Sequence, residues 1–391
     1  MVELALDRDG FPNSHEIFDG NWRDPTRGES CWTVLQKRRG RKPVDSDVIN
    51  LRSDTQTLPT EEMLEAIRHA PLGDDTYDED PTVQKFEALA AEIFGKEAAL
   101  LVISGTMGNL TALMAHGRPG DEVLLDQDSH IFNSEVGGIA SVAGLMPRPL
   151  RSHSGRLDPD ELTFAIRKRD LHNPTPRLLC LENTHNRSGG TVTPLSLHKE
   201  LCKVARERGL AIHLDGARIF NAAIYAGVSA SQYAEDVDSV MFCLSKGLSC
   251  PLGSVLVASR EFIARAEKCR KRLGGGMRQA GIIAACGIVA LEKMIDRLSE
   301  DHANAQVLAR GLNEIRGLHV ALETVQTNMV NTDHSASGLS TDEVLARFKD
   351  MGVLASGRPP KQVRLVTHRN CDKAMIGEAL TRIRVTMDQV R

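Results

Sequence analysis

Five short apolar runs, each followed directly by a polar cluster, constrain the fold of this 391-residue chain more than any other feature. Amphipathic helical stretches separate the runs. Strands that are apolar throughout and alternate with helices are typical of a parallel sheet covered on both faces. We therefore expect an α/β protein whose large domain has a mostly parallel sheet. The predicted strands are Leu100–Ile103, Glu122–Leu125, Leu178–Leu181, Leu210–Leu214 and Ser239–Cys243.

The polar clusters share one position, because each begins where a predicted strand ends. In parallel sheets, ligands bind beyond the carboxyl ends of the strands. The sequence therefore predicts a functional site at that edge of the sheet. The clusters begin at Ser104, Asp126, Glu182, Asp215 and Leu244.

Changes in composition indicate three parts of the chain. Residues 1–46 carry both tryptophans and a basic run. We interpret them as an extension that packs on the surface or on a partner subunit, rather than as a nuclear address or a polyanion patch. Residues 47–315 form the predicted large domain, and residues 316–391 a small C-terminal α+β domain. In the small domain we expect strands at Leu318–Leu322 and Val363–Thr367.

Capping residues and glycines mark helix ends in the second half of the chain. Ser340 and Glu343 have the spacing of a capping box and predict a helix start. Another helix is expected from about Asp372 to the end of the chain. Gly274–Gly276 predicts a break within a helix-rich segment that spans about 255–315.

Composition argues against several classes of protein. The formal net charge of −4 gives no basic field for nucleic acid, and no apolar run approaches the roughly 20 residues that span a membrane. The N-terminus has neither the basic nor the apolar region of a signal peptide. The eight cysteines form no CxxC pair, so we expect buried thiols in a reducing, cytoplasmic compartment rather than disulfides or a metal site.

An acid and a lysine follow two of the strands, about thirty residues apart. Asp215 begins the cluster Asp-Gly-Ala-Arg, and Lys246 lies between Ser245 and Gly247. An enzyme that uses pyridoxal phosphate needs both groups, because the lysine amine holds the cofactor aldehyde as a Schiff base and the carboxylate keeps the pyridine nitrogen protonated. The Ser-Lys-Gly motif alone fits a surface turn equally well. Its position after a strand, with Asp215 upstream, favours the Schiff base.

Other strand-end clusters offer groups for the same site. Gly105 and Thr106 predict a phosphate cup, because glycine lets the backbone approach the anion and helix N-terminal amides bind it. An ordinary capped turn uses the same residue types. His130 could stack on the pyridine ring, and neutral His185 could accept the proton of a substrate hydroxyl.

Two arginines could hold a substrate carboxylate. The fork of Arg218 suits that carboxylate or the phenolic oxygen of the cofactor. Arg364, from the predicted small domain, could clamp the carboxylate bidentately. The acidic loop 73–81 could be a solvated turn that caps the helix at Thr82, or a lid.

From about Val48 to its C-terminus, the chain resembles the low-specificity L-threonine aldolases, in the aromatic amino acid beta-eliminating lyase/threonine aldolase group. The resemblance is specific because several motifs occur in the order of the family. It implies a fold-type I pyridoxal phosphate enzyme, similar to aspartate aminotransferase, that cleaves L-threonine, L-allo-threonine or a related β-hydroxy-α-amino acid to glycine and an aldehyde. The motifs are LRSDTQTLPTEEM, GDDTYDEDPTV, SGTMGNL, DSHIF, LENTHN, HLDGARIFNA, LSKGLSCPLGS, GGGMRQAG and RLVTH.

The resemblance also implies roles for individual residues and a homo-oligomer, either a dimer or a tetramer, with active sites shared between subunits. The implied roles are Lys246 for the Schiff base, Asp215 for the pyridinium nitrogen, His130 for ring stacking, Gly105 and Thr106 with Arg278 of a neighbouring subunit for the phosphate, Ser53, Arg218 and Arg364 for the substrate carboxylate, and His185 near the β-hydroxyl.

Three departures from the family concern the first 46 residues, which have no counterpart in its short members, and two positions near the site. Asp78 stands where the family usually has glycine, and Arg187 adds a cation on the presumed aldehyde side. Both departures concern the side chain of the substrate more than the reaction class. An amino-acid racemase or a β-eliminating lyase on the same scaffold would keep Lys246, Asp215 and the phosphate cup, so both stay open. A non-catalytic regulatory protein of this fold is disfavoured by the intact set of lysine, aspartate and arginines.

Overall fold

The computed structural model describes residues 48–389 of the chain. These residues form one compact unit, which begins at Ile49. The predicted extension 1–46, with its basic run, its tryptophans and Cys31, lies outside the described residues. The seven other cysteines are buried free thiols, as predicted. No helix among the described residues is long and apolar enough to cross a membrane.

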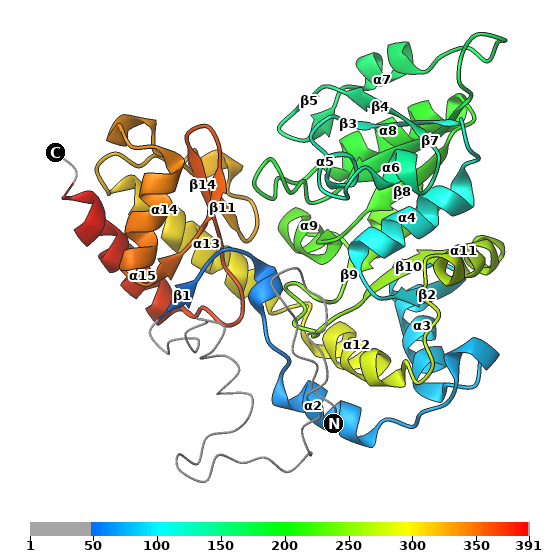
Figure 1. The fold of residues 1–391 in the computed structure, drawn as a ribbon, viewed down its shortest axis with the longest axis horizontal. Coiled ribbons are helices and arrows are strands. Elements are labelled where there is room, and N and C mark those ends of the chain that lie inside the picture. Colours follow the sequence, from blue (N-terminus) through cyan, green and yellow to red (C-terminus); the bar gives the residue numbers. More distant parts are fainter. Residues whose placement is uncertain (1–47, 390–391) are drawn as a thin grey trace, which may run out of the picture. The chain divides into compact units, whose positions relative to one another are not determined.

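A seven-stranded sheet forms the centre of the large domain (Figure 1). The strand order is β2-β10-β9-β8-β7-β3-β4, and only β10 runs antiparallel to its neighbours. The predicted α/β class with a mostly parallel sheet is therefore confirmed. The strands are β2 (Ala98–Val102), β3 (Glu122–Asp126), β4 (Met146–Leu150), β7 (Pro176–Glu182), β8 (Ala211–Asp215), β9 (Ser239–Cys243) and β10 (Ser254–Ala258).

Two strands of this sheet, β4 and β10, were not predicted from the sequence. Strand β4 contains two prolines and lies at the edge, where a missing backbone donor is tolerated. Strand β10 is apolar and fully buried, but it begins the segment that was expected to be rich in helices.

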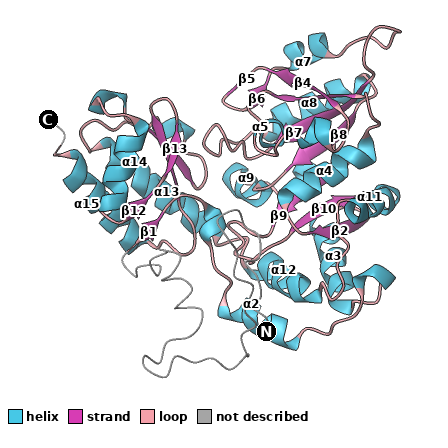
Figure 2. Ribbon diagram, viewed as in Figure 1, coloured by secondary structure: helices cyan, strands magenta, loops and turns pink. Residues whose placement is uncertain are grey.

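Helices cover both faces of the sheet, as the secondary-structure view shows (Figure 2). Side chains of β9 alternate between the two layers: Val240 and Phe242 join one core, and Met241 and Cys243 join the other. The covering helices of four turns or fewer are α2 (Glu61–His69), α3 (Pro81–Phe94), α4 (Gly105–His116), α5 (His130–Asn133), α6 (Gly138–Ser141), α7 (Pro159–Ala165), α8 (Leu195–Glu207), α9 (Ile219–Ala226), α10 (Ala230–Ala234), α11 (Arg260–Arg272) and α12 (Gly281–Lys293).

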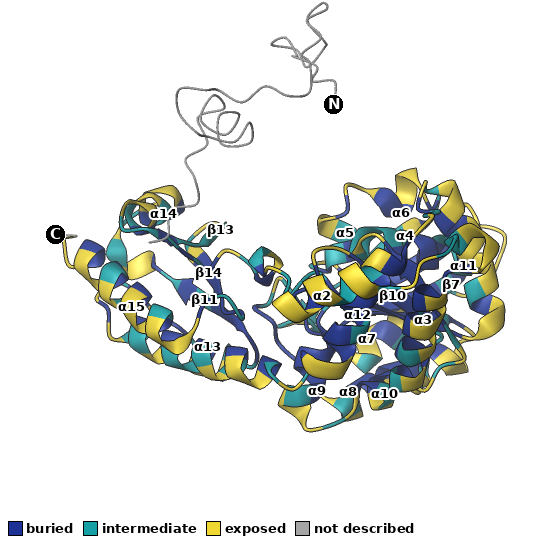
Figure 3. Cartoon of the chain, turned by 90° about the horizontal axis from the view of Figure 1, so that it is seen from below, coloured by how far each residue is buried: buried dark blue, intermediate teal, exposed yellow. Residues whose placement is uncertain are grey.

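A second hydrophobic core lies in the C-terminal part of the chain, and Figure 3 shows buried faces of its helices turned inward. It is built on an antiparallel sheet in the order β11-β14-β13 and on a short pairing of β1 with β12. Side chains from both sides of the predicted boundary at residue 316 share this core, and the boundaries themselves stay a prediction. The elements are β1 (Ile49–Asn50), α13 (Leu298–Asn313), β11 (Met329–Asp333), α14 (Thr341–Asp350), β12 (Val353–Leu354), β13 (Ser356–Arg358), β14 (Gln362–Val366) and α15 (Lys373–Met387).

The strand predicted at Leu318–Leu322 is wrong. The backbone of Val320 bonds instead to the side-chain amide of Asn313, which donates to its carbonyl at 2.9 Å and accepts from its N–H at 2.6 Å. Only one isolated bridge, His319 to Asp333, pairs this segment with β11. The other local predictions are confirmed: β14, the capping box at Ser340, the start of α15 at Asp372 and the break between α11 and α12.

Candidate active site

The polar clusters meet at the carboxyl edge of the sheet, as predicted, and hydrogen bonds join them across neighbouring strands. Asn109, in the helix after β2, donates to Asp215 at the end of β8. The backbone N–H of His130, after β3, donates to Glu182 at the end of β7 at 2.6 Å. Residues from four strand ends are therefore held together in one site.

Asp215 is 2% exposed, and its carboxylate is held from both sides. Asn109 Nδ2 donates to Oδ2 at 2.9 Å, and the backbone N–H of Ala217 donates to Oδ1 at 3.1 Å. Burial of a carboxylate is costly unless it is hydrogen-bonded or paired with a cation. These contacts position an acid that can meet a cationic ligand nitrogen, which is the role predicted for Asp215.

Glu135 is a functional candidate that sequence analysis missed. Its Oε1 accepts from Asn109 Nδ2 at 2.8 Å and lies 2.9 Å from His130 Nδ1. Burial raises the pKa of Glu135, and the charge of Asp215 adds to this effect. The hydrogen bond to Glu135 raises the pKa of His130 above its ordinary value, although burial opposes the change. No sequence motif marked Glu135, because it follows the short helix α5 rather than a strand.

Lys246 lies in the loop after β9, and its backbone is anchored. Its carbonyl accepts from Thr57 Oγ1 at 2.7 Å and from the N–H of Ser249 at 2.9 Å. Its side chain is half-buried, and no described residue bonds to the amine. The ammonium charge lowers the pKa of Asp54 and opposes protonation of His130, so the amine lies within electrostatic reach of both.

Arg218 forms a buried ion pair with Asp54 that sequence analysis did not predict. Arg218 Nε and Nη2 each donate to one carboxylate oxygen at 2.6 Å. Asn328 Nδ2 also donates to Asp54, at 3.2 Å. The pair occupies two nitrogens of the fork that was expected to hold a substrate carboxylate. Ser53, expected to bind the same carboxylate, caps the turn that contains Asp54 through its hydroxyl.

Arg364 lies in the centre of β14 and is 9% exposed, yet no carboxylate among the described residues contacts it. Its Nη1 donates to Asn186 Oδ1 at 2.8 Å and its Nη2 to the carbonyl of Arg52 at 3.3 Å, while Nε has no partner. Burial and repulsion from Arg358 and Arg218 lower the pKa of Arg364 to about 9. This cation lacks an anion, which fits its predicted role in holding a substrate carboxylate.

His185 is 1% exposed, and both of its ring nitrogens face protein groups. Nδ1 accepts from the N–H of Ser188 at 3.2 Å and lies 2.8 Å from the hydroxyl of the same residue. Nε2 lies 3.4 Å from Asp126 Oδ2. A Cβ atom on Gly155 would lie 2.2 Å from the ring, so the backbone of Gly155 packs closely against the imidazole. The predicted role of His185 as a base stays a prediction.

Gly105 and Thr106 begin α4, a helix of 12 residues that follows the carboxyl end of β2. The amides of its first turn have no carbonyl partner within the helix. A Cβ atom on Gly105 would lie 2.9 Å from Cys243 Sγ, so only glycine lets the helix start against β9. Ser104 caps the helix through Met107 N. The positive end of the helix suits a phosphate.

The acidic loop 73–81 is held in place by hydrogen bonds and an ion pair to other parts of the same chain. Asp80 caps α3 through the N–H groups of Thr82 and Val83 and also accepts from the N–H of Gly281 at 3.0 Å. Asp75 pairs with buried Arg270 at 3.0 Å. These contacts favour the capping interpretation of the loop. Arg278, predicted to reach a neighbouring subunit, has an exposed side chain that pairs with Asp74 at 3.2 Å.

A buried hydrogen-bond chain leads from Asp215 to the opposite edge of the sheet. Asn109 Oδ1 lies 3.1 Å from His213 Nε2, and both His213 Nδ1 and His116 Nε2 lie 2.8 Å from Ser239 Oγ. Burial lowers the pKa of both histidines to about 3, so both rings are neutral. Because the amide of Asn109 faces two carboxylates, His213 must donate from Nε2 to its oxygen.

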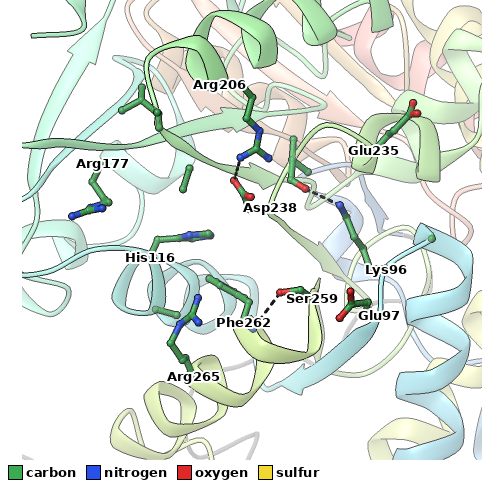
Figure 4. Close-up of a pocket in the computed structure, with 16 residues that line it drawn as sticks. Lys96, Glu97, His116, Arg177, Arg206, Glu235, Asp238, Ser259, Phe262 and Arg265 are labelled. Atoms are coloured by element: carbon green, nitrogen blue, oxygen red, sulfur yellow. Dashed lines mark hydrogen bonds and ion pairs between the residues drawn. The ribbon is translucent and has the colours of Figure 1, made fainter.

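His116 also lines a surface hollow with a volume of about 800 Å³ (Figure 4). The hollow lies at the amino ends of β8 and β9, away from the edge that carries Lys246. Its Lys96 donates to the carbonyl of Val237 at 2.7 Å, and its Arg206 pairs with Asp238 at 2.9 Å. The hollow is therefore not the candidate active site.

The groups at the carboxyl edge fit pyridoxal phosphate. They comprise an uncommitted primary amine at Lys246, a hydrogen-bonded carboxylate at Asp215 and a helix N-terminus at Gly105, where a larger residue would not fit. The half-exposed ring of His130 lies among them, anchored by Glu135. A cofactor with an aldehyde, a basic ring nitrogen and a phosphate needs these three partners.

Comparisons with known proteins show which family the chain belongs to. The beta-eliminating lyase family matches residues 50–335. The low specificity L-threonine aldolase of Escherichia coli (strain K12) is 42% identical over 332 residues, which cover 85% of this chain and 97% of the relative. The probable low-specificity L-threonine aldolase 2 of Arabidopsis thaliana is 42% identical over 331 residues, 83% of this chain and 93% of the relative.

A solved structure supports the fold. The threonine aldolase of Leishmania major superposes with a TM-score of 0.75 at 19% identity, over 88% of this chain and 99% of that chain. The fold is also that of an SPT structure solved with PLP (TM-score 0.69, 19% identity, 88% of each chain), so the architecture is that of fold-type I pyridoxal phosphate enzymes, as predicted. The identity over nearly the whole length of the relatives decides the assignment: the chain belongs to the beta-eliminating lyase family and, within it, to the low-specificity L-threonine aldolases.

Proposed function

We propose that this protein cleaves L-threonine, L-allo-threonine or a related β-hydroxy-α-amino acid to glycine and an aldehyde. The observation that carries the proposal is the meeting of Lys246, Asp215 and His130 at one sheet edge, with the unbalanced cation of Arg364 in the same site. Relatives that are about 42% identical carry the name low-specificity L-threonine aldolase.

Pyridoxal phosphate, when bound, supplies the electron sink that accepts the electrons of the broken Cα–Cβ bond. The amine of Lys246 provides the covalent anchor. Asp215 holds a proton on the ring nitrogen, and its own position is fixed by Asn109. The first-turn amides of α4 at Gly105 and Thr106 bind the phosphate.

Arg364 holds the α-carboxylate of the substrate, because its Nε–H is buried and lacks an acceptor. Ser53 and Arg218 border the same position. Asp54 keeps Arg218 charged and immobile through two hydrogen bonds. A fixed carboxylate orients the Cα–Cβ bond for cleavage, which is the main contribution that positioning makes to such a reaction.

A proton acceptor for the β-hydroxyl is needed, and His130 suits the role better than His185. The ring of His185 is enclosed, whereas the side chain of His130 is 33% exposed and its Nε2 has no partner among the described residues. Glu135 binds Nδ1 and fixes the ring orientation, as a carboxylate commonly does for a functional histidine.

We also propose a cytoplasmic homo-oligomer, either a dimer or a tetramer. The buried free thiols of the described residues suit a reducing compartment. The exposed Arg278 could reach the phosphate site of a neighbouring copy. Sedimentation of the purified protein tests the assembly, and Arg278→Met tests the shared site through cofactor affinity.

The activity is tested with purified protein supplied with pyridoxal phosphate. Acetaldehyde and glycine should form in equal amounts from L-threonine or L-allo-threonine, and Lys246→Ala should abolish both. Production of D-alanine from L-alanine at a higher rate would favour a racemase instead. No aldehyde from either substrate or from phenylserine would overturn the aldolase proposal.

A further inference from the structure

One face of the small antiparallel sheet forms a wall of the site. Asn331, Arg364 and Ser356 are in register across β11, β14 and β13. Arg358 follows Ser356 by two residues on β13, so its side chain lies on the same face, diagonal to Arg364. This face therefore presents two arginines side by side.

A loop of the large domain packs against this face. Asn186 accepts from Arg364 Nη1 at 2.8 Å. A Cβ atom on Gly189 would lie 2.8 Å from the amide nitrogen of Asn331. Arg187 lies between these two loop residues and pairs with Asp128 at 3.3 Å on the surface. The loop and the sheet face thus enclose the arginines beside the candidate active site.

The two arginines of this face are short of acceptors. The Nε atoms of Arg358 and Arg364 are both buried without a hydrogen-bond partner among the described residues. A buried donor without an acceptor costs free energy, and a buried charge without a partner costs more. Such groups are uncommon in native proteins, and a bound ligand is one partner that can complete them.

The charges of the site show the same deficit. Four arginines contribute to this deficit. Burial, Arg187 and Arg218 lower the pKa of Arg358. Burial, Arg358 and Arg218 lower the pKa of Arg364. Among the described residues, the only carboxylate bonded to any of Arg218, Arg358 and Arg364 is Asp54. Two positive charges remain without a bonded anion, and the α-carboxylate of an amino acid balances only one.

We propose that the substrate is a β-hydroxy-α-amino acid whose side chain carries a second anionic group, and that Arg358 binds this group. The inference rests on the proposed aldolase function and names its substrate class. A carboxylate and a phosphate both match the fork of arginine. Arg187, in the loop between Asn186 and Gly189, adds positive charge that would attract either anion.

The reaction balances for a carboxylate substrate, 3-hydroxyaspartate. The Cα–Cβ bond breaks, and the β-hydroxyl gives its proton to the base while its oxygen becomes the carbonyl of glyoxylate. Cα takes up a proton, which yields glycine. A phosphorylated substrate such as 4-phosphooxy-L-threonine would give glycine and glycolaldehyde phosphate by the same bond changes.

The first experiment compares substrates on the wild-type holoenzyme. Initial rates are measured with L-threonine, L-allo-threonine, both diastereomers of L-3-hydroxyaspartate, and 4-phosphooxy-L-threonine. We expect kcat/KM for at least one anionic substrate to exceed that for threonine about 10-fold or more, the scale of one charge-assisted bond. Comparing kcat/KM for the hydroxyaspartates with kcat/KM for 4-phosphooxy-L-threonine shows whether the site prefers a carboxylate or a phosphate.

The second experiment tests Arg358 directly. Arg358→Met should lower the ratio of kcat/KM for the preferred anionic substrate to kcat/KM for threonine by about 10- to 100-fold. Arg358→Lys should lower the ratio less, because the charge is kept and the fork is lost. Arg384→Met, which removes an exposed pair with Glu314, is the matched control and should leave the ratio unchanged.

A measurement on the wild type covers the case in which the variants do not fold. L-Aspartate carries the second carboxylate but no β-hydroxyl, so it should inhibit threonine cleavage at least 10-fold more strongly than L-alanine. Equal inhibition by the two amino acids would contradict a second anion site.

The remaining outcomes separate the two proposals. Cleavage of threonine without cleavage of any anionic substrate would overturn the inference and leave the aldolase function standing. No cleavage of any of these compounds would overturn the function itself. An unchanged substrate ratio in Arg358→Met, with a changed oligomer mass, would show that Arg358 binds an acid of a neighbouring copy instead.

Discussion

Asp54 accepts two hydrogen bonds of 2.6 Å from Arg218, and both side chains are almost completely buried. Burial alone would raise the pKa of Asp54. The charge and hydrogen bonds of Arg218, aided by Lys246 and Asn328, instead hold it well below its ordinary value. The carboxylate is therefore ionised throughout the working range of the enzyme and fixes the arginine beside the substrate position.

Asp54→Asn should destabilise the protein by about 3 to 5 kcal/mol, because it leaves the buried guanidinium of Arg218 without its counter-charge. Urea unfolding measures the change. Asp54→Leu combined with Arg218→Met should recover most of the stability without recovering activity, since no buried charge is then left alone. A single variant as stable as the wild type would contradict this account.

The same ion pair sets an acid limit. A carboxyl group whose pKa is lower in the folded protein than in the unfolded chain stabilises the fold at any pH above its unfolded-state pKa. This contribution is lost as the pH falls from the unfolded-state pKa toward the folded-state pKa. We therefore expect the stability difference between wild type and Asp54→Asn to shrink below about pH 4. A difference that stays constant from pH 7 to pH 3 would contradict the pairing.

The bond between His130 and Glu135 should control the acid limb of the pH–rate profile. Glu135 raises the pKa of His130, and a base works only when deprotonated, so activity should rise with pH through that raised pKa. Glu135→Gln should move the acid limb of kcat/KM to lower pH. His185→Asn should leave the position of the limb unchanged. A shift with His185→Asn and none with Glu135→Gln would return the base role to His185.

Much of the fold could be predicted because burial dictates residue type directly. The strands found from sequence are mainly apolar, and nearly all of their residues are buried: β2, β3, β7, β8 and β9. Strand β4 lacks that signal, because its prolines and exposed positions suit an edge. The segment around Val320 alternates like a strand, but the side chain of Asn313 takes its backbone hydrogen bonds.

The site was predictable where chemistry requires a residue type after a strand, as for Lys246 and Asp215. It was not predictable where one side chain serves another. Asp54 binds Arg218 across 164 positions of the sequence and Asn109 binds Asp215 across 106, so no local pattern links the members of these pairs. Glu135 lies only five positions from His130, but no motif marks it. Asp54 and Asn109 do lie inside motifs that were noticed for other reasons.

Asp78 shows that a departure from a family pattern can have a conformational reason. Its φ of 57° and ψ of 38° lie in the left-handed region, which glycine occupies without strain and aspartate tolerates. The glycine usual at this position in the family would suit that conformation. The substitution therefore need not concern the substrate, although sequence analysis connected it with the substrate side chain.

Asn109 should control cofactor affinity through Asp215. Its amide donates to Glu135 and Asp215 at once, so Asn109→Leu removes the donors that separate two buried carboxylates. We expect the dissociation constant for pyridoxal phosphate to rise by about 10- to 100-fold. Titration of the apoenzyme, followed by absorbance, measures it. His116→Asn, at the far end of the hydrogen-bond chain, is the control with a smaller effect, and equal effects would contradict the role of Asn109.

Glu87 should make the fold less stable as the pH rises. Burial raises its pKa to about 8, although a hydrogen bond from the N–H of Leu101 and the charge of Arg270 oppose the change. The folded state therefore keeps this carboxyl protonated between about pH 4.5 and pH 8, while the unfolded chain releases the proton. Glu87→Gln keeps the acceptor for Leu101 and removes the titration. Its Tm should match that of the wild type near pH 4.5 and exceed it by a margin that grows up to pH 8. Glu92→Gln changes an exposed position on the same helix and is the control; its Tm should not exceed that of the wild type by an amount that depends on pH. A Tm difference between Glu87→Gln and the wild type that is the same at pH 5 and pH 8 would rule out the raised pKa.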